Sequence, residues 1–332
     1  PLAVANRKKH EITLIANSLA PETVYFAEGK DAVVVFTNDL LDKQIIDKLA
    51  DYGIRYIATR SVATNHIDRV AAAGRNIKVA NVPHHSQNST AEHTLAIALA
   101  LNRKIIPAGL DTRNFDYSLD GLTNFNFHEK TVGIIGCGVI GKQVAQIFKG
   151  LGCHVMVNDI ILNPSEAEFP LVSLEKLLAT ADIVSIHIPS NEENRYLVNK
   201  ETIAKMKTGV MLLNTSGNDL VDISAVHSAL KDKKIGYFGS SISEKDGELF
   251  FNTDHNDESK SIIKELRSLK NVILSPQQTF LTHEALQEIA TQTIRNLDNW
   301  HLNKCTGKAC ACLNHCRKDE VILEKLALNN LL

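Results

Sequence analysis

The sequence has 332 residues, of which 44% are hydrophobic and 22% are charged, and this composition is typical of a globular protein large enough for two domains. A formal net charge of −2 and the absence of a Lys/Arg block provide no electrostatic basis for binding nucleic acid. The purest apolar stretch, 95–101, is too short to span a membrane, and the N-terminus lacks the apolar core of a signal peptide, so we expect a cytoplasmic protein.

The N-terminal part of the chain alternates short strand-like runs with helical stretches. Strands are predicted at 11–17, 32–37, 56–62 and 78–83, and helices at 39–53 and 67–76. A longer helix is predicted at 89–105, beginning with a capping box of Ser89 and Glu92. Its apolar positions are dense enough to indicate burial on more than one side, as at a subunit interface.

The middle of the chain repeats the same alternation in longer form, which predicts βαβ units and a parallel sheet. The predicted strands are 131–136, 154–159, 182–189, 210–216, 237–243 and 271–276. Helices are predicted between them at 141–152, 173–181, 200–209 and 223–236, and a last helix at 283–300 is expected to return the chain to the first domain.

A glycine-rich turn, "GCGVIG", follows the first strand of this middle region and opens its helix. Gly136, Gly138 and Gly141 fit the G-x-G-x-x-G dinucleotide pattern, and the next strand ends at Asp159. The glycines permit a tight turn and close approach of the backbone to a pyrophosphate, and the helix N-terminus offers N–H groups to that anion. Asp159 can accept hydrogen bonds from ribose hydroxyls and would repel a 2′-phosphate, which favours NAD over NADP.

Several segments together resemble the D-isomer-specific 2-hydroxyacid dehydrogenase family, and its D-lactate dehydrogenase branch in particular. The matching segments are "YIATRSVATNHIDRVAAAGRNIKVANVP", "NSTAEHTLAIALALNRK", "TVGIIGCGVIG", "DIVSIHIPSNEEN", "LLNTSGNDLVD" and "NVILSPQQTF". The resemblance implies an α/β fold in which a Rossmann-type doubly wound NAD domain (84–283) is inserted into a smaller flavodoxin-like substrate domain (1–83 and 284–332). It also implies a homodimer that transfers hydride between NAD(H) and a 2-hydroxy or 2-keto acid.

The resemblance further implies a set of cofactor-binding residues. These are Gly136, Gly138, Val139, Ile140, Gly141, Asp159, His187, Pro189, Thr215, Ser216 and Ser241. Within this set, "HIP" (187–189) resembles the segment that lines the adenine pocket, and Ser241 stands where the family has an Asp that anchors the nicotinamide carboxamide.

The catalytic positions of the family are mostly replaced. Of its Arg, His and Glu, only the Glu is retained, as Glu244, while the Arg position carries Gly217 and the His position carries Gln277. Glycine cannot neutralise a carboxylate and glutamine has no proton to exchange near neutral pH, so we expect a catalytically impaired protein, a pseudoenzyme.

An active enzyme with a displaced acid/base is the alternative reading. His85 is the first candidate, because it matches an active-site Tyr position; His84 and His283 are weaker candidates. No motif places Arg60 or Arg113 at the site.

Four cysteines lie close together beyond the family match. Cys305, Cys310, Cys312 and Cys316 form a C-x4-C-x-C-x3-C pattern with His315 beside it, and four thiolates could hold zinc or an iron–sulfur cluster. The spacing matches neither a zinc ribbon nor a plant-type ferredoxin, so a metal-linked redox activity is a third reading and a compact tail without metal is the other. At the opposite end, only ten residues precede the segment 11–17, so we expect the substrate domain to lack an element or the sequence to be shortened.

Overall fold

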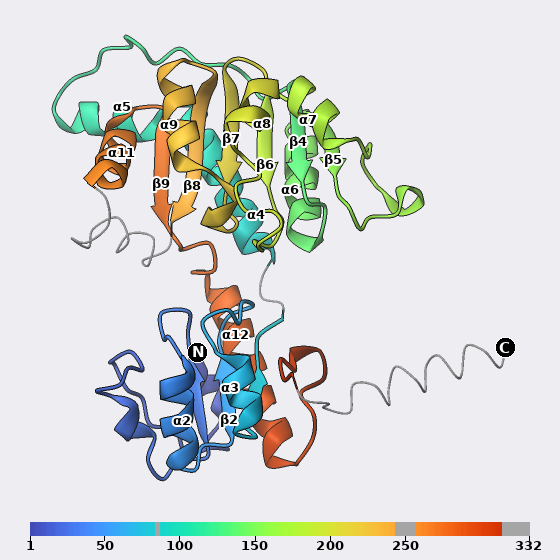
Figure 1. Ribbon diagram of the computed structural model, residues 1–332. Coiled ribbons are helices and arrows are strands. Elements are labelled where there is room, and N and C mark those ends of the chain that lie inside the picture. The colour runs from blue at the N-terminus through green and yellow to red at the C-terminus, as the bar shows by residue number, and fades with distance from the viewer. Residues whose placement is uncertain (84–86, 243–256, 314–332) are drawn as a thin grey trace. The chain divides into compact units, whose positions relative to one another are not determined.

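The computed structural model describes residues 1–83, 87–242 and 257–313. The chain divides into two compact units, which we call unit 1 (Pro1–Ser86 with Thr282–Leu332) and unit 2 (Gln87–Leu281). Their elements are labelled in Figure 1. Among the described residues, no helix combines the length and the apolar character needed to cross a membrane.

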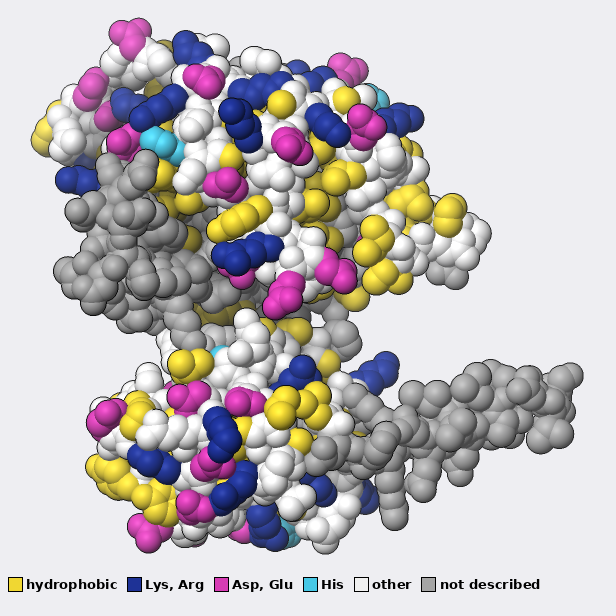
Figure 2. All heavy atoms as spheres, viewed as in Figure 1, with side chains coloured by type: hydrophobic (Ala, Val, Ile, Leu, Met, Phe, Trp, Pro, Cys, Tyr) yellow, Lys and Arg dark blue, Asp and Glu magenta, His cyan; other side chains and the backbone are white. Residues whose placement is uncertain are grey.

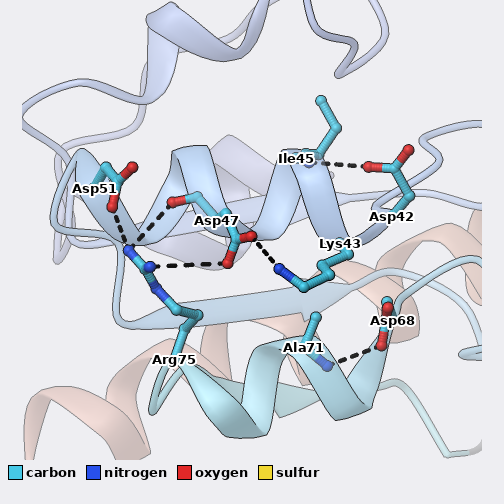
Figure 3. Close-up of polar contacts among 8 residues, drawn as sticks. All are labelled: Asp42, Lys43, Ile45, Asp47, Asp51, Asp68, Ala71 and Arg75. Atoms are coloured by element: carbon cyan, nitrogen blue, oxygen red, sulfur yellow. Dashed lines mark hydrogen bonds and ion pairs between the residues drawn. The ribbon is translucent and has the colours of Figure 1, made fainter.

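Unit 1 contains a three-stranded parallel sheet in the order β1-β2-β3. Its elements are α1 (Leu2–Asn6), η1 (Val24–Ala27), β1 (Ala32–Val35), α2 (Lys43–Asp51), β2 (Tyr56–Thr59), α3 (Arg69–Gly74), β3 (Lys78–Ala80), α12 (His283–His301) and η4 (Gly307–Ala309). Two aspartates define the helix starts: Asp42 accepts the N–H of Ile45 and Asp68 that of Ala71 (Figure 3). The C-terminal segment adds an antiparallel bridge to β3, between Cys310 and Ala80.

The strand predicted at 11–17 is wrong. The structure assigns no strand to this segment, and Leu14 and Ile15 are exposed. A strand requires a neighbouring chain to complete its hydrogen bonds, and among the described residues no strand pairs with this segment. Its alternation of apolar and polar residues is therefore not sufficient to form one.

Unit 2 contains a six-stranded parallel sheet in the order β5-β4-β6-β7-β8-β9. The strands are β4 (Thr131–Ile135), β5 (His154–Asn158), β6 (Ile183–Ile186), β7 (Val210–Asn214), β8 (Ile235–Ile242) and β9 (Val272–Pro276). In the sheet, β5 lies on one side of β4, and β6 to β9 follow in order on its other side. The order therefore reverses at β4 and β6, where open α/β sheets bind ligands at the carboxyl ends of the strands.

Helices cover both faces of this sheet and enclose two separate apolar cores. They are α4 (Gln87–Asn102), α5 (Ile105–Arg113), α6 (Val139–Gly150), α7 (Leu174–Thr180), α8 (Lys200–Lys205), α9 (Ile223–Lys231) and α11 (Asp257–Ser268). Two short 3₁₀ helices, η2 (Pro164–Glu166) and η3 (Asn218–Leu220), lie in the loops. The capping box expected at Ser89 is wrong, because α4 already includes Gln87 and the Ser89 hydroxyl donates to the carbonyl of Thr279.

Candidate functional site

The turn between β4 and α6 lies where the strand order reverses, and its glycines are required by close contacts. Gly136 has a φ of 88°, and a Cβ there would lie 2.6 Å from the carbonyl oxygen of His187, just after β6. A Cβ on Gly141 would lie 1.9 Å from the carbonyl oxygen of Gly136. The first and third glycines thus hold strand, turn and helix at a separation that no side chain permits.

The second glycine has a different role, because it borders open space. Gly138 is the N-cap of α6, makes no side-chain capping bond, and a Cβ there would meet nothing within 4 Å. The first N–H groups of a helix, here those of Val139 and Ile140, have no partner within the helix and carry its positive dipole end. A pyrophosphate can therefore approach this turn without a side chain intervening.

Asp159 follows β5 and is fixed by backbone donors. One carboxylate oxygen accepts the N–H of Cys137 at 2.7 Å, and the other accepts those of Ile161 at 2.8 Å and Leu162 at 3.1 Å. Burial on its own would raise the pKa of Asp159, but these N–H donors together lower it below the ordinary value, so the group is a carboxylate at neutral pH. A fixed anion here accepts hydroxyl donors and repels a phosphate.

The segment after Asp159 offers an apolar surface beside this carboxylate. Ile160 and Ile161 are 97% and 89% exposed. Figure 2 shows hydrophobic side chains gathered over the segment that follows β5. A planar apolar group such as an adenine ring could cover these side chains.

His187 directly follows β6, at the same carboxyl edge of the sheet as Gly136 and Asp159. Its Nε2 atom is 2.8 Å from the Ser185 hydroxyl, and burial lowers its pKa to about 3, so the ring is neutral. The Nδ1 atom is buried and has no hydrogen-bond partner among the described residues. Pro189, two residues on, is exposed, and its carbonyl accepts a hydrogen bond from the Asn194 amide. The residues expected to hold the adenosine half of the cofactor therefore do gather at one edge.

The hydroxyl side chains expected near the nicotinamide are hydrogen-bonded to other protein groups. Thr215 is paired with Thr94 at 2.8 Å, Ser216 donates to the carbonyl of Ile186 at 2.9 Å, and Ser241 donates to that of Pro276 at 3.2 Å. The last two contacts connect the carboxyl ends of neighbouring strands, and the first connects the end of β7 to α4. In this arrangement the three side chains stabilise the edge, and their contact with a cofactor stays a prediction.

The turn that carries the family's arginine position is closed by a neighbouring side chain. Gly217 has ordinary backbone angles, so its torsions would accept another residue. However, a Cβ there would lie 2.6 Å from the Cβ of Ser190, which belongs to the segment after β6. Asp219, two residues on, is exposed, and its carbonyl accepts the N–H of Tyr196. The loop after β6 therefore occupies the start of the path that an arginine side chain would take.

Gln277 follows β9 and is exposed. A histidine that sequence reasoning did not single out lies beside this strand end: His93 Nε2, on α4, is 3.1 Å from the Ser275 hydroxyl. Burial lowers the pKa of His93, so the imidazole is neutral near pH 7. The only signal for it was its place in the matched segment 88–104, directly after Glu92.

Several predicted site residues cannot be placed. Glu244, His84, His85, His315 and Cys316 lie outside the described residues. His283 and Arg113 are described, and both are exposed, at the start of α12 and the end of α5.

Two cysteines of the C-terminal segment, Cys310 and Cys312, contact the third strand of unit 1. Cys310 is buried and bridges Ala80, and the Cys312 sulfur lies 3.3 Å from the N–H of Val79 and 3.5 Å from its carbonyl. Cys305 lies between the end of α12 and η4 and is partly exposed. Across 1–83, 87–242 and 257–313, no three His, Cys, Asp or Glu side chains gather in a geometry that could hold a metal ion.

Comparison with known proteins agrees with this geometry. Residues 95–278 match the family model for the D-isomer specific 2-hydroxyacid dehydrogenase NAD binding domain. The chain is 39% identical over 295 residues to a 2-hydroxyacid dehydrogenase homolog of Haemophilus influenzae, covering 88% of each chain. It is similar to the apo structure of D-lactate dehydrogenase from Escherichia coli, with 33% identity, a TM-score of 0.84 and coverage of 92% and 94%. The Aquifex aeolicus D-lactate dehydrogenase complexed with NAD and lactic acid gives 26% identity, a TM-score of 0.79 and coverage of 91% of each chain.

Proposed function

The chain belongs to the D-isomer-specific 2-hydroxyacid dehydrogenase family, in its D-lactate dehydrogenase-like branch, and from this membership we propose that it binds NAD(H) but is impaired in the family's reaction. In that reaction the nicotinamide gives or takes a hydride at the carbon that bears the hydroxyl or keto group. The protein's part is to bind the substrate carboxylate and to exchange a proton with the substrate oxygen.

One observation carries the proposal: the Ser190 side chain stands directly in front of Gly217. An open space in front of Gly217 would be compatible with a simple loss of the arginine side chain. It would also leave room for a cationic side chain from another segment to take its place. A filled space indicates that the surrounding loop has adapted to glycine. The residues expected to bind the adenosine half of the cofactor are retained, so we expect the loss to be confined to the groups that would act on the substrate.

The two replacements have a large combined effect on rate. A positioned general acid contributes about 10²–10⁴-fold, and Gln277 cannot act as one. A guanidinium also binds a carboxylate through two parallel charge-assisted hydrogen bonds, which Gly217 cannot make. We therefore expect NADH binding in the range usual for dehydrogenases together with very slow reduction of 2-keto acids.

The proposal is tested by restoration. We expect Ser190→Gly/Gly217→Arg/Gln277→His to raise NADH-dependent pyruvate reduction by about two orders of magnitude or more over the unmodified chain. Gly217→Arg/Gln277→His alone should gain less and unfold at a lower temperature, because the added Cβ meets Ser190. Reduction of pyruvate by the unmodified chain at a rate that the triple change does not improve would show that the chemistry is intact and lies elsewhere.

An active dehydrogenase with a displaced acid/base is the second candidate, and the contact between His93 and Ser275 favours it. If His93 is the acid/base, His93→Gln should remove residual turnover and leave NADH affinity unchanged. If His85 is the acid/base instead, at the position that matches an active-site Tyr, His85→Gln should have this effect. A metal-linked activity is not included, because Cys310 and Cys312 contact the backbone of β3 and no metal-binding group of side chains is found among the described residues.

We further propose that the protein assembles as a homodimer through α5 and the segment after it. No residue of α5 is buried, and Ile105, Ile106 and Leu110 are between 49% and 60% exposed. Phe115 and Leu119, in the following segment, are 83% and 80% exposed. Apolar side chains gathered in this density on one helix and its continuation are typical of a subunit interface.

A further inference from the structure

A cavity of about 310 Å³ lies between α1 and α12, within unit 1. This volume is close to the lower limit of about 300 Å³ for pockets that bind small molecules. Its charged lining residues are three cations, Arg7, Lys9 and Arg295, and one carboxylate, Asp298. The cavity is therefore rich in positive charge, and none of these residues belongs to the cofactor edge of unit 2.

The carboxylate of the cavity is already neutralised by neighbouring side chains. One oxygen of Asp298 accepts a hydrogen bond from Lys9 Nζ at 2.6 Å, and the other lies 2.8 Å from His10 Nε2. Both oxygens thus have partners that come from the turn after α1. Since Asp298 balances Lys9, the positive charge of the two arginines remains.

The two arginines of the cavity are not in ion pairs. Across residues 1–83, 87–242 and 257–313, no carboxylate lies within ion-pair distance of Arg7 or Arg295, and both side chains are exposed. By contrast, Arg55 and Arg75 of the same unit each contact a carboxylate, as Figure 3 shows for Arg75. The guanidinium groups of the cavity can therefore donate to an anion from outside the chain.

The turn that carries Arg7 is held by a buried side chain. The Asn6 amide donates to the carbonyl of His10 at 2.8 Å, and its Oδ1 atom accepts the N–H of His10 at 3.1 Å. Asn6 is buried, whereas Arg7 and Lys8 adopt left-handed φ angles of 47° and 60°, which are unfavourable for residues other than glycine. The backbone at Arg7 is thus fixed before a ligand arrives, which lowers the entropy cost of binding.

The other wall of the cavity is one face of a long helix. Gln287, Thr291, Arg295 and Asp298 follow one another at intervals of three or four residues, so their side chains lie along the same side of α12. The Thr291 hydroxyl donates to the carbonyl of Gln287 at 2.7 Å and lies 3.3 Å from its amide nitrogen. This face adds polar groups beside the guanidinium of Arg295.

From this arrangement we infer that the cavity between α1 and α12 binds a small phosphate ester through Arg7 and Arg295. A phosphate monoester carries a charge of about −1.5 to −2 at neutral pH, which matches two unpaired guanidinium groups. Its three terminal oxygens can accept hydrogen bonds from both groups, whereas the two oxygens of a carboxylate suit a single guanidinium fork. Val4 and Ala5 form an apolar part of the wall, against which the carbon chain of the ester lies.

Calorimetric titration of the full chain with glycerol 3-phosphate, inorganic phosphate and uncharged glycerol tests the inference. The titrations are made at constant ionic strength and with NADH present, so that the β4–α6 turn is occupied. Arg7→Gln and Arg295→Gln should each weaken glycerol 3-phosphate binding by about tenfold or more, and Arg295→Lys by less, because lysine keeps the charge but loses the fork. Arg55→Gln, at an exposed and paired arginine of the same unit, is the matched control and should bind it unchanged.

Thermal unfolding gives a second measurement. Glycerol 3-phosphate should raise the melting temperature of the unmodified chain, because it binds only the folded state, and should not raise that of Arg7→Gln/Arg295→Gln. Circular dichroism without ligand shows whether the double variant is folded, as we expect from the exposure of both side chains.

Tighter binding of glycerol 3-phosphate than of inorganic phosphate supports an ester as the ligand, and equal binding supports free phosphate at the same two arginines. Equal affinity for glycerol 3-phosphate in the double variant and the unmodified chain would overturn the inference. Glycerol binding as tightly as its phosphate, or no phosphate binding at millimolar concentration, would also overturn it. NADH affinity, measured by fluorescence in the same samples, should not depend on either arginine, so failure of the proposed function is detected separately.

Discussion

His187 shows how burial determines the chemistry of a single residue at this site. Its ring is neutral because the surroundings of β6 exclude water, and its only protein partner among the described residues is the Ser185 hydroxyl. A neutral ring there can support an uncharged adenosine but cannot balance a phosphate. The same sequence position in an open loop would carry a partial charge at pH 6.

The burial of His187 makes the stability of unit 2 sensitive to acid. Its pKa of about 3 in the folded chain lies below the value near 6.5 expected when unfolded. Between these values the unfolded chain binds a proton that the folded chain does not. The free energy of unfolding should therefore fall as pH is lowered from about 6.5, by at most about 1.4 kcal/mol per pH unit.

Urea unfolding at pH 7.5 and pH 5, followed by circular dichroism, measures this effect. His187→Gln should reduce the difference between the two pH values, whereas His154→Gln, at an exposed histidine on β5, should not. An identical pH dependence in His187→Gln and the unmodified chain would show that the His187 ring is not held neutral.

At the scale of elements, the β4–α6 turn contains two glycines that close contacts require, Gly136 and Gly141, and one that borders open space, Gly138, which we predict to face the cofactor. The helix begins directly after the strand, and the turn is tight enough that the backbone of Gly136 nearly touches the helix at Gly141. The N-terminal N–H groups of α6 are consequently presented at the carboxyl end of β4. The predicted binding of an anion here would depend on the whole strand–turn–helix element.

Two alanine substitutions test this division. Gly141→Ala should lower the free energy of unfolding by about 2 kcal/mol or more, because its Cβ meets backbone that cannot move aside. Gly138→Ala should leave the melting temperature almost unchanged but weaken NADH binding by about tenfold or more, because the methyl group enters the space left for the pyrophosphate. Thermal unfolding and NADH fluorescence are measured on both variants. Loss of stability in Gly138→Ala, or unchanged stability in Gly141→Ala, would contradict the assignment.

At the scale of the whole molecule, unit 2 carries both the cofactor edge and the exposed apolar helix α5. The two features involve different elements, so assembly and NADH binding can be altered separately. We expect Leu110→Asp/Phe115→Asp to convert a dimer into a monomer, because charged side chains would be buried in the interface.

Light scattering after size-exclusion chromatography gives the molar mass of each variant. Ile160→Asp/Ile161→Asp is the control, since these residues are more exposed than those of α5 but lie beside the cofactor edge. It should remain dimeric and change NADH affinity only. A monomeric unmodified chain would remove the proposed interface.

Local patterns were sufficient for most of the strands and helices of unit 2 and for the cofactor turn. Each strand there is a short apolar run bounded by turn residues, and the three glycines follow a strand and open a helix at the spacing of a dinucleotide-binding turn. The same reasoning failed at 11–17, where the pattern suits a strand but no partner strand is present in the described part of unit 1. It also failed at Ser89, whose hydroxyl contacts a carbonyl 190 residues away.

The sequence by itself determined the family and its NAD-binding domain, because those depend on which residues stand at given spacings. The preference for NAD over NADP and the loss of two catalytic side chains stay predictions from the same spacings. Only the tertiary structure decided that Ser190 blocks Gly217, that His93 lies beside β9 and that Arg7 and Arg295 line one cavity without a carboxylate partner among the described residues. These contacts join segments far apart in the chain. Which side chains meet depends on the order of the strands and on the packing of the helices. Neither can be read from the spacing of residues within a short segment.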